Sequence, residues 1–264
     1  MKKIILSALV ASSLVMASEA EVKKESALVT HTELGYIQTS GNTETKTFNL
    51  DAKAKKSWNK HIFGLIFDGQ YADDDGKETK NKFVTELEYD YEFTDRFSFN
   101  YLLGYKSDKF SGLEYQAYTG PGLAYKAIVS DTHNLELSGN ILYSMDSYED
   151  VYHDADGEII NYPNSTSGAT LATEAYDDDY TGYRVKGIYG WQIIENLKFD
   201  QELSMRGSFE ESDNYFVFSK TALSTKISDM FSAGISYKVD YANVPAEGKE
   251  STDTTLTANL IIDY

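Results

Sequence analysis

Apolar and polar residues alternate along most of this chain, and the alternation is most regular near its C-terminus. In Thr252–Tyr264 one parity carries apolar side chains, at Leu256, Ala258, Leu260, Ile262 and Tyr264. The other parity holds mainly threonine, asparagine and aspartate, with Ile261 as an exception. Because successive side chains of a strand point to opposite faces, this segment predicts a strand with one apolar and one mostly polar face.

Eleven further segments alternate in the same way, between breaks rich in Gly, Asn and Asp. The predicted strands are 31–39, 46–58, 62–72, 82–93, 96–108, 115–127, 133–147, 180–192, 196–209, 214–227, 230–242 and 252–264. A sheet with an apolar outer face and a polar inner face, whose last strand pairs with its first, is typical of bacterial outer-membrane proteins. The pattern therefore predicts an all-β fold, a transmembrane antiparallel up-and-down β-barrel of about twelve strands.

The connections between these segments are of two alternating kinds. One kind is tight, as at Asn59-Lys60 and Glu195-Asn196, and the other is generally longer and polar, as at Asp73–Lys80 and Tyr148–Asp179. Membrane barrels have short periplasmic turns and longer extracellular loops. If the mature N-terminus starts in the periplasm, the tight turns lie there. The longer connections, of which 148–179 is the longest, then form acidic extracellular loops.

Aromatic residues distinguish a membrane barrel from a β-sandwich, which also alternates. On the apolar parity they gather near the tight turns, at Trp58, Phe63, Phe93, Phe97, Trp191, Phe199, Phe231 and Tyr264. They also gather near the longer connections, at Tyr36, Tyr71, Phe83, Tyr105, Tyr143, Tyr183 and Tyr241. Two aromatic rings at the two interfaces are typical of membrane barrels, whereas a sandwich core gives large aromatics no reason to favour strand ends.

Pro121 does not fit the strand predicted over 115–127. Proline has no backbone N–H and so removes one hydrogen bond from a ladder. We expect a bulge around Gly120-Pro121-Gly122 to accommodate it.

The first twenty residues have the form of a secretory signal peptide. Lys2 and Lys3 precede an apolar run over 4–16, and the small residues Ala17, Ser18 and Ala20 follow. This run is too short to span a bilayer as a helix. We therefore expect residues 1–20 to be cleaved, at Ala17 or Ala20, and residues 21–264 to form the exported barrel.

Composition narrows the chemistry further. The chain has no cysteine, which excludes disulfides, thiolate metal sites and a lipidated cysteine. A net charge of −18 argues against nucleic acid as a partner. A mean hydropathy of −0.43 does not suit a helical membrane protein, but it does suit a barrel with polar loops and a polar lumen. We expect no cofactor.

Several stretches resemble one known family. Gly35–Thr43 reads GYIQTSGNT, Asp108–Gln116 reads DKFSGLEYQ, Gly120–Tyr125 reads GPGLAY and Asp131–Leu135 reads DTHNL. These motifs resemble the YdiY-like proteins, a family described as salt-induced outer-membrane proteins and classed as a domain of unknown function. The resemblance implies an outer-membrane barrel and a link to salt or envelope stress. It brings no catalytic residues, and the segment 148–179 is longer than the family usually has.

The strand parity also fixes which charges face the lumen. On the fourth predicted strand, the polar parity carries an acidic wall of Glu86, Glu88, Asp90 and Glu92. On the eighth to tenth, it carries a basic wall of Arg184, Lys186, Lys198, Arg206 and Lys220. Further acids and bases are interspersed, so the interior is roughly balanced and the net charge lies mainly in the loops and ends.

Two interpretations of this interior remain open. In one, the charges pair across a narrow lumen and plug it, as side chains fill small barrels. In the other, the acidic and basic walls face each other across a water-filled constriction that favours polar, dipolar or zwitterionic solutes. Twelve strands lie between the filled small barrels and the open sixteen-stranded porins, so strand number does not decide between them.

The segment 148–179 contains nine carboxylates and no Lys or Arg. The reading DADGE at Asp154–Glu158 resembles the start of a calcium loop but lacks the remaining ligands and the closing glutamate. We expect a solvated anionic loop without a specific metal site. It would gather divalent cations weakly at the lipopolysaccharide surface through Asp154, Asp156, Glu158, Asp177, Asp178 and Asp179.

Catalysis is a less favoured interpretation, although some outer-membrane barrels are hydrolases. Such enzymes need a nucleophile, a base and an orienting group within hydrogen-bond reach. The four histidines are His31, His61, His133 and His153, and none pairs in parity and height with a serine. The chain also has no Gly-x-Ser-x-Gly elbow.

We therefore expect a non-enzymatic barrel in the bacterial outer membrane, most simply a narrow pore for small polar solutes or ions. A plugged structural or surface-binding barrel is the alternative, and an outer-membrane hydrolase is the third. The expected partners are outer-membrane lipid, lipopolysaccharide and the assembly machinery that would engage the C-terminal strand ending at Tyr264.

Overall fold

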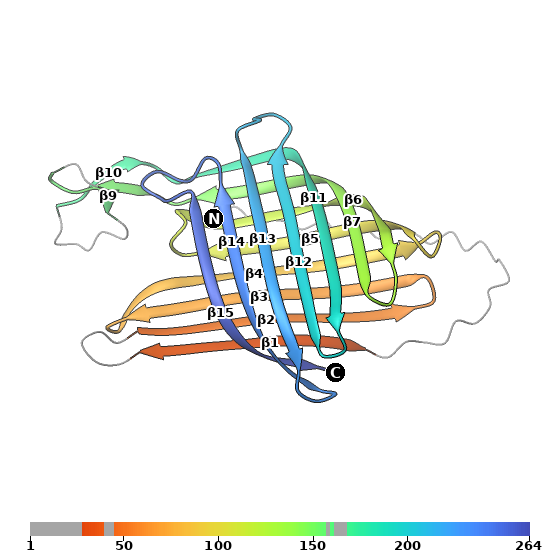
Figure 1. Ribbon diagram of the computed structural model, residues 1–264. Helices are drawn as coiled ribbons and strands as arrows, with labels where there is room; N and C mark the ends of the chain where they lie inside the picture. The colour runs from red at the N-terminus through yellow and green to blue at the C-terminus, as the bar shows by residue number, and fades with distance from the viewer. Residues whose placement is uncertain (1–27, 40–44, 157–158, 161–167) are drawn as a thin grey trace.

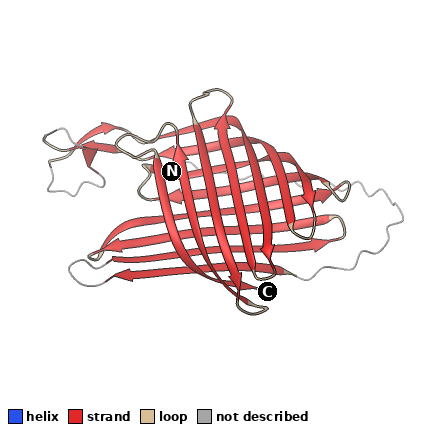
Figure 2. Ribbon diagram, viewed as in Figure 1, coloured by secondary structure: helices blue, strands red, loops and turns tan. Residues whose placement is uncertain are grey.

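The computed structural model describes residues 28–39, 45–156, 159–160 and 168–264 (Figure 1). The predicted signal peptide over 1–20 and Glu158 of the predicted acidic loop lie outside the described residues. The described chain consists of strands and connections (Figure 2). None of its residues forms a helix long and apolar enough to cross a membrane.

Twelve antiparallel strands close into one barrel, in the order β1-β15-β14-β13-β12-β11-β7-β6-β5-β4-β3-β2. These strands are β1 (Val29–Thr39), β2 (Thr45–Trp58), β3 (His61–Asp74), β4 (Lys77–Glu92), β5 (Phe97–Asp108), β6 (Leu113–Val129), β7 (His133–Tyr148), β11 (Tyr176–Ile194), β12 (Leu197–Ser208), β13 (Tyr215–Lys226), β14 (Phe231–Ala242) and β15 (Thr252–Asp263). Three short strands form a separate sheet beyond the barrel: β8 (Val151–His153), β9 (Ile159–Ile160) and β10 (Thr170–Thr173). The predicted all-β, twelve-stranded antiparallel barrel is confirmed.

The connections define two ends of the barrel. The short-turn end carries the connections 59–60, 93–96, 130–132, 195–196 and 227–230, and the long-loop end carries the others. One connection predicted to be longer is tight, because Asp75 and Gly76 both have positive φ, at 49° and 76°, and join β3 to β4 in two residues. Positive φ at both central residues is the requirement of a type I′ hairpin turn, which Asp-Gly meets.

The described part of the segment 148–179 contains strands that the sequence did not predict. Besides β8, β9 and β10, it contributes the first residues of β11, which begins at Tyr176 instead of the predicted 180. Asp177, Asp178 and Asp179 therefore belong to a barrel strand that pairs with β7, opposite Ser147, Asp146 and Met145.

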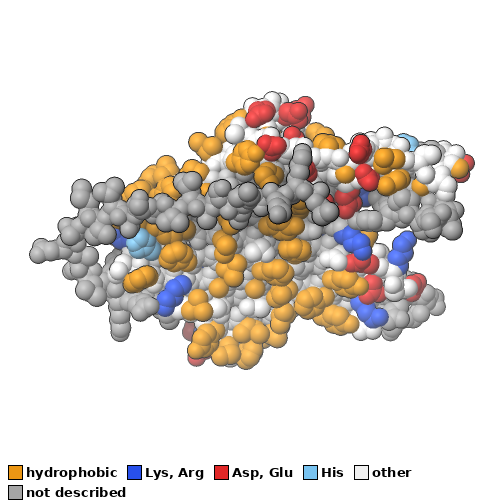
Figure 3. Space-filling model, turned by 180° about the vertical axis from the view of Figure 1, so that it is seen from behind, with side chains coloured by type: hydrophobic (Ala, Val, Ile, Leu, Met, Phe, Trp, Pro, Cys, Tyr) orange, Lys and Arg blue, Asp and Glu red, His pale blue; other side chains and the backbone are white. Residues whose placement is uncertain are grey.

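The outer wall of the barrel is apolar. Of the fifteen aromatic residues predicted to face out at the strand ends, twelve are exposed, and Phe199, Tyr183 and Tyr241 are half-buried. Between the two sets of aromatic residues lie Leu256, Ile141 and Ile235, each more than half exposed. Figure 3 shows this apolar surface across the middle of the barrel, with charged side chains toward the ends. The alternation thus sends the apolar parity outward along the strands.

The bulge predicted at Pro121 is wrong. Thr119 still pairs with Tyr143 and Gly122 with Asn140, so no residue is inserted between them. Pro121 itself keeps its register against Tyr101 on β5. The flanking glycines explain the fit, because a Cβ on Gly120 would lie 1.9 Å from a backbone oxygen of β7 and one on Gly122 would lie 2.3 Å from another. The strands approach closely there, which accommodates proline without a bulge.

The barrel closes between β1 and β15. This ladder runs from His31 opposite Asp263 to Gly35 opposite Asn259, and Thr30 exchanges both backbone hydrogen bonds with the residue after β15, Tyr264. On its other side β1 pairs with β2 along its whole length.

Candidate functional site

The lumen is crossed at mid-height by a set of charged side chains that we call the ion-pair belt. It consists of Glu33, Asp51, Lys53, Glu86, Glu88, Arg184, Lys186, Glu202 and Lys220. These residues lie on β1, β2, β4, β11, β12 and β13, at the inward parity of each strand.

One half of the belt joins β4 to β11. Arg184 donates a hydrogen bond from Nη2 to Oε2 of Glu86 at 3.0 Å, and its Nη1 lies 3.6 Å from Oε1 of Glu88. Lys186 Nζ lies 3.7 Å from the same Glu88 oxygen. Since β5, β6 and β7 separate β4 from β11 around the wall, these contacts span the lumen and are not neighbours in the sheet.

The other half joins β13 to β1 and β2. Lys220 Nζ donates to Glu33 Oε1 and to Asp51 Oδ2, both at 2.6 Å. Glu202 connects the two halves, because it lies 3.1 Å from Lys186 and 3.4 Å from Lys53. Ion pairs therefore reach from β4 to Lys53 on β2, and Asp51, two residues away on the same face of β2, begins the half that reaches β1.

The belt is shielded from solvent although it is charged. Arg184 is 5% exposed, Glu86 8% and Lys220 6%. Taking charges out of water costs several kcal/mol per ion unless partners compensate, so these groups depend on one another. A further hydrogen bond, from the Tyr118 hydroxyl to Glu86 Oε1 at 2.6 Å, fixes one carboxylate from the wall.

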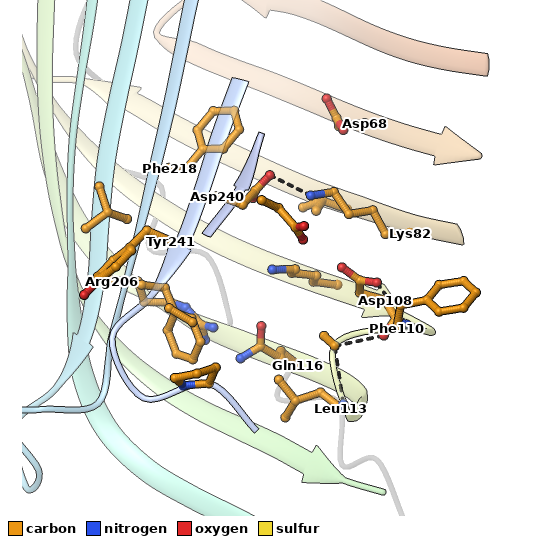
Figure 4. A pocket seen from close by; sticks show the side chains of 18 of the residues that line it. Asp68, Lys82, Asp108, Phe110, Leu113, Gln116, Arg206, Phe218, Asp240 and Tyr241 are labelled. Atoms are coloured by element: carbon orange, nitrogen blue, oxygen red, sulfur yellow. Dashed lines mark hydrogen bonds and ion pairs between the residues drawn. The ribbon is translucent and has the colours of Figure 1, made fainter. Parts of the chain in front are cut away.

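Two cavities lie on either side of the belt. The long-loop cavity, of about 490 Å³, is bordered by Lys80, Asp108 and Phe110 near the loops (Figure 4). The short-turn cavity, of about 530 Å³, is bordered by His31, Glu195 and Asp229 near the turns. Lys53, Glu202 and Lys220 line both cavities, so the belt is the partition between them.

The predicted acidic wall faces the lumen, but its members have different partners. Glu86 and Glu88 belong to the belt, whereas Asp90 accepts a hydrogen bond from Asn100 at 2.7 Å. Glu92 forms an ion pair with Lys126 at 2.8 Å.

The predicted basic wall is also divided. Arg184 and Lys186 reach the acidic wall, and Lys220 instead binds Glu33 and Asp51. Lys198 lies in the short-turn cavity and pairs with Asp200 on its own strand at 2.8 Å. Arg206 lies nearer the long loops, with its guanidinium 4.6 Å from the Tyr118 ring centroid and 4.8 Å from that of Phe216.

The sequence analysis did not identify three residues of the lumen: Glu33, Tyr118 and Gln116. Glu33 lies on the inward parity of β1, so its place in the lumen was readable from the alternation. Tyr118 breaks the pattern, because it is an aromatic on the inward parity and only 8% exposed. Gln116 is 2% exposed and lines the long-loop cavity. A glutamine at an inward-facing position is expected from the alternation, so nothing in the sequence marks it as a site residue.

The predicted acidic-loop carboxylates do not converge. Asp154 accepts the backbone N–H of Asp156, Asp177 accepts a hydrogen bond from Ser147, and Asp179 accepts one from Tyr143. Burial, and then the charge of Glu211, raise the pKa of Asp178 at the long-loop rim. Within the described part of the chain, no three His, Cys, Asp or Glu side chains are placed to hold a metal ion.

Three of the four histidines have hydrogen-bond partners on the barrel strands. His61 and His133 hydrogen-bond through Nδ1 to the hydroxyls of Tyr89 and Tyr189, each at 2.8 Å. His31 lies between Asp263 and Glu33, at 2.7 and 3.1 Å.

A closed antiparallel barrel with an apolar outer face, aromatic strand ends and a lumen of paired charges defines the class of porin-like β-barrels. The chain belongs to the family described as "Protein of unknown function, DUF481", whose model matches residues 32–264. It is 23% identical over 232 residues to the uncharacterized protein YdiY of Escherichia coli (strain K12), covering 86% of this chain and 79% of that one. The predicted resemblance to the YdiY-like family is thereby confirmed.

Solved structures that match this chain include two porins and one translocator domain. The NanC porin is 11% identical with a TM-score of 0.46, over 90% of this chain and 99% of that one. The KdgM porin is 13% identical with a TM-score of 0.42, over the same shares. The translocator domain of the autotransporter NalP from Neisseria meningitidis is 7% identical with a TM-score of 0.46, over 90% of this chain and 86% of that one.

Proposed function

We propose that this protein is an outer-membrane barrel that provides a narrow passage for small polar solutes or ions, and that the ion-pair belt is its constriction. The apolar outer wall and the aromatic strand ends support the membrane location. In this orientation the short-turn end faces the periplasm and the long-loop end faces outward.

The observation that carries the proposal is the arrangement of the two cavities. Each opens toward its own end of the barrel, and both reach Lys53, Glu202 and Lys220. A partition of side chains separates two spaces large enough for small solutes. Solute passage then requires only that belt side chains exchange partners, because the strands themselves leave a continuous interior.

Planar-bilayer recording of the refolded protein tests this proposal. Discrete conductance steps are the expected result. The gel mobility of unboiled against boiled protein establishes that the barrel is folded. Folded protein that leaves the bilayer silent would contradict the passage.

A second candidate is a plugged barrel with a structural or surface-binding role. The specific observation in its favour is the burial of the belt, whose central cations and carboxylates are all less than 9% exposed at Glu33, Asp51, Glu86, Arg184, Lys186 and Lys220. Replacing Arg184 and Glu86 together by Gln separates the two candidates. A passage conducts both before and after this replacement, whereas a barrel plugged by the belt is silent as wild type and gains conductance only in the variant.

The surroundings of the barrel follow from the same orientation. The acidic long-loop end would meet lipopolysaccharide and gather divalent cations weakly between its carboxylates and the lipid phosphates. The C-terminal strand β15 would engage the assembly machinery before it pairs with β1. A role under salt or envelope stress, and the absence of catalysis, complete the proposal. The stress link is tested by comparing growth at high salt of a strain that lacks this protein with growth of its parent strain.

A further inference from the structure

The long-loop cavity contains polar groups that the barrel itself does not satisfy. Gln116 is 2% exposed, and neither its amide nitrogen nor its amide oxygen has a hydrogen-bond partner within the described structure. A buried amide without partners costs free energy, so such a group is unusual unless something else binds it. Figure 4 shows Gln116 and Arg206 pointing into the same space.

A cation without a partner lies beside this amide. Lys106 is directly opposite Gln116 in the β5–β6 register and lines the same cavity. It forms no ion pair with any carboxylate that the structure describes. The negative charges of Asp240 and Asp108 attract Lys106, but both carboxylates have other partners. Asp240 forms an ion pair with Lys82 at 2.6 Å. The other, Asp108, accepts the backbone N–H of Phe110 at 3.2 Å.

Arg206 adds a second cation with free hydrogen-bonding capacity. The rings of Tyr118 and Phe216 lie against its guanidinium, which leaves its edge available. Its Nη1 has no hydrogen-bond partner in the described structure and lies 3.8 Å from Oδ1 of Asp146, which is beyond hydrogen-bond distance. The planar fork of a guanidinium suits a carboxylate.

Apolar side chains form one part of the cavity wall, and acids and bases form the rest. Phe110, Leu113, Phe218 and Val244 line it on the side toward the loops. A volume of about 490 Å³ is within the range of small-molecule sites, which combine apolar walls with a few convergent polar groups.

We propose that the long-loop cavity is a binding site for a small organic carboxylate that has an apolar body and an amide or hydroxyl group near the carboxylate. Lys106 and Arg206 bind the carboxylate, the Gln116 amide bonds the neighbouring polar group, and the apolar body lies against Phe110 and Leu113. This inference deepens the proposed passage, because it assigns the class of solute that the outward-facing side of the belt selects.

The test measures binding alone, in detergent, so its result does not depend on conductance. The probe is N-acetyl-phenylalaninate, followed by ligand-detected NMR titration against the folded barrel, with empty micelles as the blank. Its neutral analogue, N-acetyl-phenylalaninamide, has the same body without the charge. We expect the carboxylate to bind about tenfold more tightly or better, equivalent to about 1.4 kcal/mol. Equal binding of the two probes would overturn the proposal.

Variants locate the site. Lys106→Met and Gln116→Glu should each weaken binding of the carboxylate by about tenfold, the first by removing a cation and the second by occupying the cations with its own charge. Lys77→Met removes one positive charge from the exposed turn at the same end and should leave the affinity unchanged. Retained binding in Lys106→Met, with gel mobility showing a folded barrel, would overturn the assignment. A barrel that binds the probe but carries no current would retain this site and refute the passage.

Discussion

The two cavities are similar in volume, at about 490 and 530 Å³, but differ in what their charges do. In the short-turn cavity the cations are matched locally, since Lys198 pairs with Asp200 and Lys226 with Asp229. In the long-loop cavity Lys106 and Arg206 keep free hydrogen-bonding capacity, and phenylalanine and tyrosine side chains line this cavity but not the other one.

This difference shows that alternation alone does not make a functional lumen. Both cavities are lined mainly by inward-facing positions of the barrel strands, so both are polar. What separates them is whether the sequence also provides a partner for each charge. A cavity whose charges are fully paired behaves as a solvated vestibule, whereas a cavity whose desolvated groups keep free hydrogen-bonding capacity is suited to bind an ion from outside.

Removing the partition between the cavities should have the largest effect. Lys220→Met leaves Glu33 and Asp51 buried without their shared cation, and breaking a buried pair from one side costs about 3–5 kcal/mol. Urea unfolding in lipid vesicles, followed by gel mobility, measures the loss. Lys226→Met, which removes an exposed turn cation, is the control and should change stability little. Equal stability of both variants would show that the buried Glu33 and Asp51 do not depend on Lys220.

Changing the charge of the belt on one side should alter selectivity as well as stability. Replacing Glu86 and Glu88 by Gln and Asp90 by Asn keeps their shape. The change removes both ion pairs of Arg184 and leaves Lys186 with Glu202 alone. The reversal potential under a salt gradient should shift toward anions. Glu78→Gln at the long-loop end is the matched control. An unshifted reversal potential would remove these carboxylates from the conduction path.

The smallest effect is expected at the rims. Burial and Glu211 raise the pKa of Asp178, so its charged form is disfavoured in the folded barrel. Asp178→Asn should therefore stabilise the barrel slightly at pH 7, and the gain should fade as the pH falls through the raised pKa and vanish below the ordinary value of 3.8. Unfolding midpoints across this pH range measure it.

Asp229 at the opposite end provides the contrast. The hydrogen bond from Lys226 lowers the pKa of Asp229, so the charged form contributes stability above its ordinary pKa and loses it as the pH falls through the lowered one. Asp229→Asn should therefore destabilise slightly at pH 7. If Asp178→Asn and Asp229→Asn changed the stability at pH 7 in the same direction, the proposed difference between the two rims would be wrong.

The sequence predicted the wall of this barrel well and its lumen only in part. Strand positions and faces depend on local alternation, which the residues themselves display, so β2 and β3 were placed within a residue or two. The pairing of Glu86 with Arg184, 98 residues apart, depends on the stagger of the strands, which sets the height at which charges meet. The unsatisfied Gln116 could not be found from sequence, because only the packing around it removes its partners.

Pro121 shows the limit of a local rule. Proline predicted a bulge, but the two flanking glycines allow β6 to approach β7 without inserting a residue. The proline and its two flanking glycines are both visible in the sequence. Only the strand register shows that no residue is inserted there.

The closing ladder between β1 and β15 has a consequence for how the barrel exchanges with its surroundings. It pairs β1 only as far as Gly35, whereas β1 and β2 stay paired to Thr39. Fewer backbone hydrogen bonds hold this seam than any full-length strand pair, so its amide protons should exchange with deuterium earliest among the barrel strands. The same edge is the least costly place for the wall to part sideways, toward the lipid.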